Sequence, residues 1–524
     1  MTGGIYSVSG PVMVVCEDEV LRSLVRRQLE SYRIEVVSVE ARLPDKIPPH
    51  TANVIYLSDE VSLSFCELSP PSSADGFNLS KVQHEGVNYW FICSRSARGR
   101  YYGFMKFLDG ADDVQESPSF SLRGLVEGFY GQPWSWENRS EIVDLMSGLK
   151  MNIYVYAPKD DPLHRSRWRQ KYDAGTMEKF RHLASQCSER FVDFCYALSP
   201  GLDVEYGNEE EVERVCDKFK QFAEIGVRVF GLFLDDVPPL LGQRDKERYG
   251  SLAEAQTHFV ESVYRRVGEL CDDARLIFCP TVYHGSPQSE YLSEISVIPR
   301  EVGILWTGPE VCSRRIGSAH LKEVSRVLRR KLIIWDNYPV NDYDPHRRNV
   351  NAVRNRDPDL SDYCEGFLVN PMNQAHASKV AIFTYGEFLW NPREYRPDLS
   401  LERALDYVFG TDLLPYAKVL VDNLEDLLDT SPAAIEPAID ALDGGDELDL
   451  ELARARFEEL EEVGRLLEGL EDEELLEELR EHIEKLSDIG TLGRLRVEEE
   501  IISRKILRNT ARVLSPDLVR RLIR

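Results

Sequence analysis

The sequence predicts an α/β protein whose central part is a (β/α)8 TIM barrel, preceded by a small α/β domain and followed by an α-helical domain. Three observations lead to this fold class. Eight short apolar runs occur in the central part, each run ends in a polar or turn-forming cluster, and amphipathic stretches separate most of them. Continuous apolar runs are typical of buried parallel strands, and amphipathic stretches are typical of the helices that cover them. We therefore expect domains at residues 1–118, 119–395 and 396–524.

The eight apolar runs are expected to form the strands of the barrel. They cover residues 124–131, 151–158, 192–200, 227–236, 275–283, 303–309, 331–337 and 366–372. Amphipathic segments such as 208–226 and 252–271 lie between them. An open doubly wound sheet is the alternative, but it usually has fewer strands, and no GxGxxG phosphate-binding loop follows the first run. Eight strand–helix units are what a (β/α)8 barrel requires.

The N-terminal region alternates between strand-like and helix-like segments, which predicts a small α/β domain. The strand-like segments lie at residues 11–16, 34–40, 53–58 and 86–94, and a helical stretch lies at 17–32. The segment 109–120 is polar and contains a proline. We expect it to be the linker to the barrel.

The C-terminal region is strongly acidic and has no strand pattern. Residues 401–524 hold 32 acidic and 16 basic side chains, and thus 16 of the 27 net negative charges. Leucine and glutamate recur at three- and four-residue spacing over residues 449–486, which predicts a pair of long acidic helices, and residues 497–514 are predicted to form another helix. A helical bundle with a solvated charged face is the main interpretation. The alternatives are a partner-binding arm and a surface that could pair two chains as a homodimer.

Composition and charge exclude several classes of partner. Of the 524 residues, 43% are hydrophobic and 29% are charged, and the net charge is −27. This charge argues against a nucleic-acid or anionic-membrane surface. No apolar stretch approaches the about 18 residues of a membrane span, and the first residues lack the basic region and apolar core of a signal peptide.

The cysteines and histidines do not indicate a metal site. The ten cysteines are scattered from Cys16 to Cys364 without a CxxC pair, so a disulfide framework or structural zinc site is not expected. The ten histidines show no HExxH spacing. We expect a cytoplasmic protein without a metal or cofactor.

Polar and aromatic residues gather where the predicted strands end. The carboxyl ends of the strands of a (β/α)8 barrel meet on one face, where the active site lies. The residues at these ends are Glu127, Gly128, Phe129, Tyr130, Gly131, Lys159, Asp235, Asp236, Tyr283, Trp306, Trp335, Asp336, Asn337 and Asn370. His164, Arg165 and Trp168 lie in the loop beyond Lys159, and Asp342 lies five residues after Asn337. Any one of them alone would more often be a packing or surface residue. Aromatic rings, amides, carboxylates and a lysine together indicate a sugar-binding site, because sugars offer both apolar faces and hydroxyl groups.

The adjacent carboxylates in "FGLFLDD" (residues 230–236) are the most informative feature of this set. Two neighbouring carboxylates repel each other, and one of them tends to hold its proton. A helix N-cap beside a surface carboxylate is the structural alternative. The pair alone would fit either interpretation equally well, and the other polar and aromatic residues at the strand ends are what favours a functional use.

Several segments in order along the chain resemble glycoside hydrolase family 84. They are "RGLVEGFYGQPW" (123–134), "YAPKDDPLHRSRWR" (156–169), "FLDD" (233–236), "FCPTVY" (278–283), "LWTGP" (305–309), "WDNYPVNDYD" (335–344) and "LVNPMNQ" (368–374). This family includes bacterial β-N-acetylglucosaminidases and animal protein O-GlcNAcase. The resemblance implies a retaining exo-β-N-acetylglucosaminidase that acts on terminal β-linked N-acetylglucosamine in a glycan or glycoprotein, through an oxazoline intermediate.

The resemblance also implies a role for each site residue. Asp235 would orient the acetamido group of the substrate, and Asp236 would be the general acid and base. The residues that would contact the acetamido group are Tyr283, Trp335 and Asn337. Those that would bind sugar hydroxyls are Gly128, Lys159, Asp342 and Asn370. The residues expected to shape the floor of the pocket are Tyr130 and Trp306.

Two other functions compete with this one. A non-catalytic glycan- or protein-binding module would have kept the barrel and lost turnover, but neither aspartate is replaced. An endo-acting hyaluronidase-type enzyme would need a cleft open at both ends, whereas Asp342 and Asn370 are expected to close around a terminal sugar.

Overall fold

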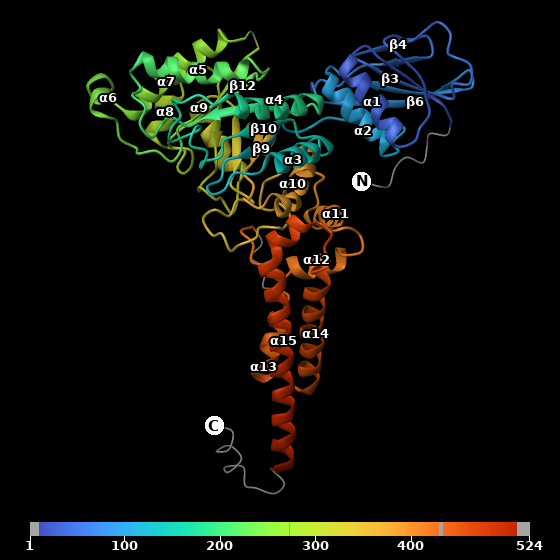
Figure 1. Cartoon of the computed structure of the whole chain (residues 1–524), viewed down its shortest axis with the longest axis vertical. Coiled ribbons are helices and arrows are strands. Elements are labelled where there is room, and N and C mark those ends of the chain that lie inside the picture. Colours follow the sequence, from blue (N-terminus) through green and yellow to red (C-terminus); the bar gives the residue numbers. More distant parts are fainter. Residues whose placement is uncertain (1–9, 272, 429–432, 511–524) are drawn as a thin grey trace. The chain divides into compact units, whose positions relative to one another are not determined.

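The computed structural model describes residues 10–271, 273–428 and 433–510 (Figure 1). The chain forms two compact units. Unit 1 comprises Met1–Asn337, Asn355–Asn373 and Tyr385–Tyr395, and unit 2 comprises Tyr338–Arg354, Gln374–Thr384 and Arg396–Arg524. The domain boundaries that we placed after residues 118 and 395 stay a prediction.

Unit 1 contains a closed barrel of eight parallel strands, which confirms the predicted fold class. The strands are β9 (Leu122–Glu127), β10 (Ile153–Tyr156), β11 (Asp193–Leu198), β12 (Val229–Phe233), β13 (Arg275–Cys279), β14 (Gly303–Trp306), β15 (Leu332–Asp336) and β16 (Cys364–Val369). They pair in chain order, and β16 closes the barrel against β9. Their carboxyl ends therefore share one face of the barrel.

Side chains fill the interior of the barrel. The buried interior cluster includes Val126, Val155, Ala197, Phe233 and Leu368, which come from five different strands. Because successive side chains of a strand point to opposite faces, the residues between these positions point outward to the helices. This alternation decides which residue at each strand end faces the site.

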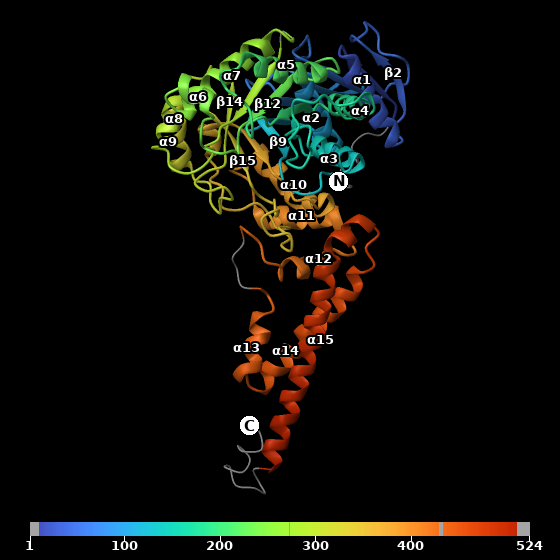
Figure 2. The same ribbon diagram turned by 60° about the vertical axis from the view of Figure 1, so that its left-hand side comes forward.

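Helices lie around the outside of the strands (Figures 1 and 2). They are α3 (Trp136–Gly148), α4 (Ala174–Glu189), α5 (Glu209–Ala223), α6 (Gln243–Arg248), α7 (Leu252–Gly268), α8 (Glu290–Ile295) and α9 (Ser318–Leu328), with a short 3-10 helix at Leu360–Asp362. The predicted amphipathic segments are confirmed as α5 and α7. Side chains that accept a backbone N–H begin four of the helices, namely Ser135, Asp173, Asn208 and Ser251.

The N-terminal part of unit 1 is a six-stranded sheet with the order β2-β1-β3-β7-β6-β8. Its strands are β1 (Val12–Cys16), β2 (Val36–Glu40), β3 (Asn53–Ser58), β6 (Phe77–His84), β7 (Val87–Cys93) and β8 (Val114–Glu116), and a hairpin of β4 (Val61–Leu63) and β5 (Cys66–Leu68) extends from it. Helices α1 (Glu19–Ser31) and α2 (Ala97–Leu108) pack on the sheet in one buried cluster. The predicted small α/β region is confirmed.

The segment 109–120 is not a plain linker, and this prediction was wrong in part. Residues Val114–Glu116 form β8, which pairs with β6. The carboxylate of Glu116 then accepts hydrogen bonds from Lys150 Nζ at 3.1 Å and from Trp390 Nε1 at 2.9 Å. A polar segment can thus be a sheet edge when its side chains bind the neighbouring barrel.

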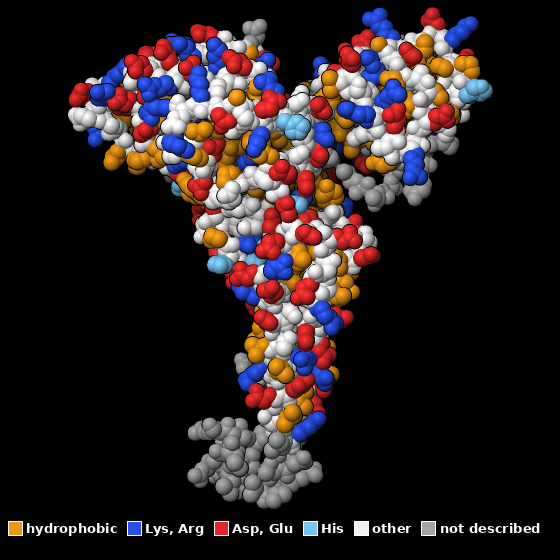
Figure 3. Space-filling view, viewed as in Figure 1, with side chains coloured by type: hydrophobic (Ala, Val, Ile, Leu, Met, Phe, Trp, Pro, Cys, Tyr) orange, Lys and Arg blue, Asp and Glu red, His pale blue; other side chains and the backbone are white. Residues whose placement is uncertain are grey.

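Unit 2 is helical. It contains α11 (Pro397–Phe409), α12 (Leu414–Val421), α13 (Glu436–Gly444), α14 (Glu447–Leu467) and α15 (Glu473–Thr510), and α10 (Ala375–Trp390) is shared between the two units. Helices α14 and α15 are the predicted acidic pair. Figure 3 shows acidic and basic side chains side by side along them, in agreement with ion pairs such as Arg454–Glu458.

The prediction of a separate helix at residues 497–514 was wrong, because residues 497–510 continue α15. Residues 511–514 lie outside the described part of the chain. Gly490 and Gly493 do not end the helix. A Cβ atom on Gly493 would lie 2.1 Å from the ring of Phe457, so this glycine lets α14 approach α15 closely.

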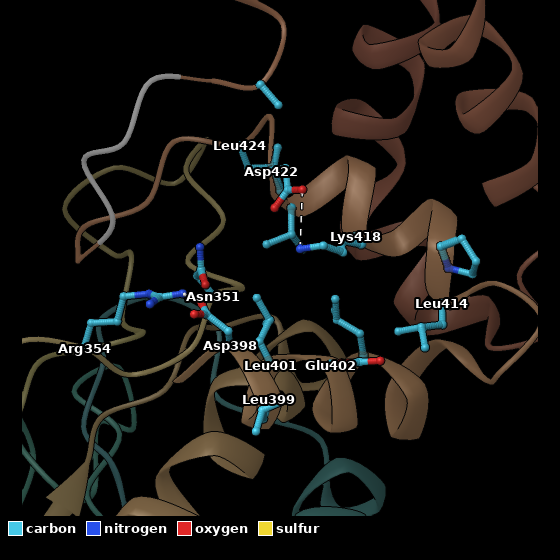
Figure 4. Close-up of a pocket in the computed structure, with 14 residues that line it drawn as sticks. Asn351, Arg354, Asp398, Leu399, Leu401, Glu402, Leu414, Lys418, Asp422 and Leu424 are labelled. Atoms are coloured by element: carbon cyan, nitrogen blue, oxygen red, sulfur yellow. Dashed lines mark hydrogen bonds and ion pairs between the residues drawn. The ribbon is translucent and has the colours of Figure 1, made fainter. Parts of the chain in front are cut away.

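Unit 2 also has a hollow of about 660 Å³ beside α11 and α12 (Figure 4). Leucines such as Leu401 and Leu405 line it, together with Lys418, which lies 3.6 Å from the carboxylate of Asp422. No predicted site residue lines this hollow. In the part of the chain that the structure describes, no helix has both the length and the apolar character needed to cross a membrane.

Candidate active site

Asp235 lies just beyond the end of β12 and forms a buried ion pair. Lys159, which follows β10, donates from Nζ to Oδ2 of Asp235. Both residues are 5% exposed. A buried ion pair of this kind persists because each charge compensates the lost hydration of the other.

The other carboxylate oxygen of Asp235 is not satisfied. Oδ1 is buried and accepts no hydrogen bond from any residue that the structure describes. Burial by itself would raise the pKa of Asp235, but the Lys159 ammonium, together with the Arg165 guanidinium, holds this pKa below its usual value. Asp235 is therefore an ionised carboxylate with one oxygen available to a hydrogen-bond donor.

Asp236 has different surroundings although it is the next residue. Its side chain is exposed, and it accepts hydrogen bonds from Tyr130 Oη at 2.9 Å and from Tyr283 Oη at 2.6 Å. Burial and the Asp236 carboxylate both raise the pKa of Tyr283, which remains a hydrogen-bond donor. The two aspartates are thus separated into a buried, lysine-paired group and an accessible, tyrosine-bonded group.

A chain of hydrogen bonds joins the predicted residues of β9, β15 and β16. Trp335 Nε1 donates to Asn337 Oδ1 at 2.8 Å, and Asn370 Nδ2 donates to the same oxygen at 2.9 Å. The N–H of Gly128 donates to Asn370 Oδ1 at 3.2 Å. Asn337 Nδ2 in turn donates to the carbonyl of Val311 at 2.8 Å. These bonds fix the orientation of both amides.

Trp335 connects this chain to the aspartates. The Lys159 ammonium lies 5.5 Å from the centroid of the indole ring, and Phe233 packs against the ring with a centroid separation of 5.4 Å. A Cβ atom at Gly128 would lie 2.3 Å from Cζ2 of Trp335. Only glycine at position 128 allows the indole to occupy this place.

The structure brings together eight of the nine residues predicted to act in catalysis or binding. The ninth, Asp342, belongs to unit 2 and is half-buried there. Its neighbour Asn341 donates to the carbonyl of Arg347 at 2.7 Å, which holds this loop together. The role of Asp342 stays a prediction.

The prediction for Trp306 was wrong. Its ring is fully buried and stacks on His320 of α9, to which Nε1 donates at 3.2 Å. Strand alternation explains this, because Leu305 is the residue of β14 that faces the interior of the barrel. Tyr130, in contrast, lies at the site through its bond to Asp236.

Sequence reasoning missed the arginines that hold the strand ends. Arg139 forms two hydrogen bonds to the carboxylate of Glu127, both of 2.8 Å. Arg356 does the same for Asp336, at 2.7 and 2.6 Å. Both carboxylates were placed at strand ends from the sequence, and each lies next to a site residue and points the other way. Their arginine partners, 12 and 20 residues further along the chain, could not be identified, because nothing in the sequence distinguishes them from other arginines.

A (β/α)8 barrel with adjacent carboxylates, amides and aromatic rings at its strand ends has the architecture of a glycoside hydrolase. The structure is similar to that of the O-GlcNAc hydrolase of Thermobaculum terrenum, solved as a mutant, with a TM-score of 0.69 and 29% identity over 77% of this chain and 93% of the other. It also shares the fold of CpGH84B, with a TM-score of 0.79 and 24% identity over 96% of this chain and 90% of the other.

The β-N-acetylglucosaminidase family matches residues 123–422, and the chain belongs to this family of glycoside hydrolases. The family resemblance predicted from the sequence is confirmed. The protein O-GlcNAcases of Rattus norvegicus and Mus musculus are each 38% identical to this chain over 271 residues. That region is 50% of this chain and 29% of each relative, so the chain spans less than a third of the length of these relatives.

Proposed function

We propose that the chain is a retaining exo-β-N-acetylglucosaminidase that uses the acetamido oxygen of its own substrate as the nucleophile. The observation that carries this proposal is the buried, unsatisfied Oδ1 of Asp235 beside the Lys159 ion pair. A buried polar atom without a partner costs about 1–3 kcal/mol. The N–H of a bound acetamido group would satisfy this oxygen and would be oriented by it.

In the first step the acetamido oxygen attacks the anomeric carbon while the bond to the leaving oxygen breaks. Asp235, held ionised by Lys159, accepts a hydrogen bond from the acetamido N–H and stabilises the positive charge of the oxazolinium form of the intermediate. Asp236 gives its proton to the leaving oxygen as general acid. The exposed position of Asp236 supports this role, because the leaving group has to reach it.

In the second step water attacks the anomeric carbon and the bond to the acetamido oxygen breaks. Asp236 removes the proton of the water as general base, which restores its acidic form. Two successive inversions give retention of configuration without a covalent bond to an enzyme carboxylate.

The hydrogen-bonded amides support the binding roles that we propose for the other residues. Val311 accepts one N–H of Asn337, and Asn337 accepts one N–H of Asn370. The second N–H of each amide is the group that would donate to the acetamido oxygen or to a sugar hydroxyl. Asp342 stays a proposed binding residue for a sugar hydroxyl, and exo action on a terminal sugar is proposed with it.

The proposed substrate class is a protein that carries O-linked N-acetylglucosamine, because the mammalian relatives are protein O-GlcNAcases. A cytoplasmic location is proposed with it. The scattered cysteines without CxxC pairs support this location, since they give no sign of a disulfide framework.

The test is hydrolysis of 4-nitrophenyl β-N-acetylglucosaminide by wild type, Asp235→Asn and Asp236→Asn, with Asp217→Asn on the exposed face of α5 as the matched control. We expect kcat to fall about 10²–10⁴-fold in the two site variants and to stay unchanged in the control. The N-trifluoroacetyl substrate should react much more slowly with wild type, because its amide oxygen is a poorer nucleophile. Equal rates for the two substrates would refute participation of the acetamido group.

A further inference from the structure

The two neighbouring aspartates point into different surroundings, so the backbone between them turns sharply. The φ angle of Asp236 is 52°. This is the left-handed region, which costs a residue with a side chain about 1–2 kcal/mol. Such a conformation persists only when the surrounding structure holds it.

The guanidinium of Arg165 holds the backbone at this turn. Its Nη2 donates to the carbonyl oxygen of Asp236 at 2.8 Å, and its Nη1 donates to Ser199 Oγ at 3.2 Å. Arg165 is buried, and its guanidinium carbon lies 5.9 Å from the ring centroid of Tyr130, one of the two hydroxyl donors to Asp236. One arginine therefore bonds the main chain of Asp236 and packs against a residue that bonds its side chain.

Arg165 comes from the same loop as Lys159, and Asp161 organises that loop. The carbonyl of Asp161 accepts the N–H of Arg165 at 3.2 Å. The donors to its carboxylate are Tyr156 Oη, Tyr172 Oη and the N–H of Leu163, at 2.8, 2.6 and 2.8 Å. A single braced loop thus presents one cation to the side chain of the first aspartate and another to the backbone of the second.

We propose that Arg165 is a positioning residue that fixes the left-handed turn at Asp236 and thereby aims the acid carboxylate at the leaving oxygen. Arg165 acts through the main chain of Asp236. Lys159 acts on the side chain of Asp235 and holds its carboxylate toward the position proposed for the acetamido group. This inference rests on the proposed function, in which Asp236 protonates the leaving group.

The proposal predicts a dependence on the leaving group. An unsubstituted phenyl leaving group needs a proton from Asp236, whereas 2,4-dinitrophenolate departs as a stable anion without one. The value of kcat/KM reports the steps up to formation of the oxazoline, where the proton is needed. A misdirected acid should therefore slow the phenyl substrate and leave the dinitrophenyl substrate nearly unaffected.

The experiment compares kcat/KM for phenyl and 2,4-dinitrophenyl β-N-acetylglucosaminide in wild type, Arg165→Met and Arg167→Met. Arg167 is an exposed residue of the same loop and serves as the matched control. We expect Arg165→Met to lose about 100-fold on the phenyl substrate and less than about 3-fold on the dinitrophenyl substrate. Equal losses on both substrates, or no loss on either, would overturn the proposal.

Ser199→Ala keeps the proposal testable if Arg165→Met does not fold. This variant removes only the second anchor of the guanidinium, so a smaller but still selective loss on the phenyl substrate is expected. A uniform loss or no loss would overturn the proposal here as well. Failure of the proposed function is distinguishable, because wild type would then hydrolyse neither substrate.

Discussion

The buried carboxylates at the ends of the barrel strands fall into two groups that differ in how completely their oxygens are bonded. Glu127 and Asp336 point outward from β9 and β15, and neither is exposed to solvent. Each pairs with an arginine through two hydrogen bonds and also accepts a tyrosine hydroxyl. Glu127 accepts the N–H of Trp134 as well.

Asp235 faces the site, and among the described residues one side chain, that of Lys159, bonds its carboxylate. Lys159 bonds one of its oxygens, and the other has no donor among the described residues. This difference is the one that we expect between a structural carboxylate and a carboxylate that binds a ligand. The oxygens of a fully bonded carboxylate already accept hydrogen bonds from the protein. A half-bonded carboxylate has one oxygen that regains the hydrogen bond lost on burial only when a ligand donates to it.

The largest expected effect is a loss of stability when a fully bonded carboxylate, Glu127 or Asp336, loses its arginine. Arg139→Met would leave Glu127 buried without a counter-charge, and we expect a loss of about 3–5 kcal/mol in the free energy of unfolding. The thermal unfolding of unit 1 measures it. Arg181→Met, which removes an exposed i,i+3 pair with Glu178, is the control and should cost at most about 1 kcal/mol. Equal melting temperatures for the two variants would contradict the claim that the buried Glu127–Arg139 pair stabilises the fold more than an exposed pair does.

Gly128 lies next to the structural carboxylate Glu127 but contacts Trp335 of the site, so a substitution there should affect activity more than folding. Gly128→Ala places a methyl group against Trp335, so the indole must move away from Lys159 and Asn337. We expect kcat/KM to fall about 10–100-fold and stability to fall by about 1–3 kcal/mol.

Gly268→Ala in α7, where an added Cβ atom meets nothing within 4 Å, is the control for this variant. It should leave kcat/KM unchanged. Wild-type activity in Gly128→Ala would show that the close approach to Trp335 does not matter for the reaction.

The last comparison uses the position of the pH profile and not its height, because Lys159→Met also leaves the buried Asp235 without its counter-charge and therefore lowers stability. In wild type burial raises the pKa of Asp235, but the Lys159 ammonium and the Arg165 guanidinium together lower it below its usual value, so the ion pair contributes stability above the ordinary pKa of aspartate and loses it as the pH falls through the lowered pKa. In Lys159→Met the main attraction is lost, and burial raises the pKa of Asp235 against the weaker attraction of Arg165. The acidic limb of the kcat/KM profile should then move to higher pH.

The control for this shift is Lys171→Met, because Lys171 is exposed and pairs with Asp217 on the surface. Its pH profile should match that of wild type. An unshifted acidic limb in Lys159→Met would mean that Lys159 does not set the protonation of Asp235.

The barrel could be predicted because each strand is a continuous apolar run, which fixes both its type and its place in the order. Strand ends were less predictable. The run 227–236 was longer than β12, since Leu234 is fully buried even though the strand ends at Phe233. Burial and strand pairing end at different residues. An apolar run in the sequence indicates where burial ends, but not where strand pairing ends.

The site could be predicted to the extent that its residues follow strands. Asp235, Tyr283 and Asn370 follow β12, β13 and β16, and shared strand ends place them on one face. Arg165 could not be assigned a role, because its partners are a backbone carbonyl and a serine hydroxyl that only the folded chain brings to it. Attention to strand alternation would have removed Trp306 from the prediction.

The most direct test is the affinity for a bicyclic thiazoline derived from N-acetylglucosamine, whose protonated form imitates the charged intermediate and carries a ring N–H donor where the acetamido N–H lies. Calorimetric titration of wild type and Asp235→Asn measures the contribution of the Asp235 carboxylate. The account predicts affinity at least about 100-fold weaker in Asp235→Asn, equivalent to about 2.7 kcal/mol. Equal affinities would contradict the claim that the unsatisfied oxygen of Asp235 receives the acetamido group.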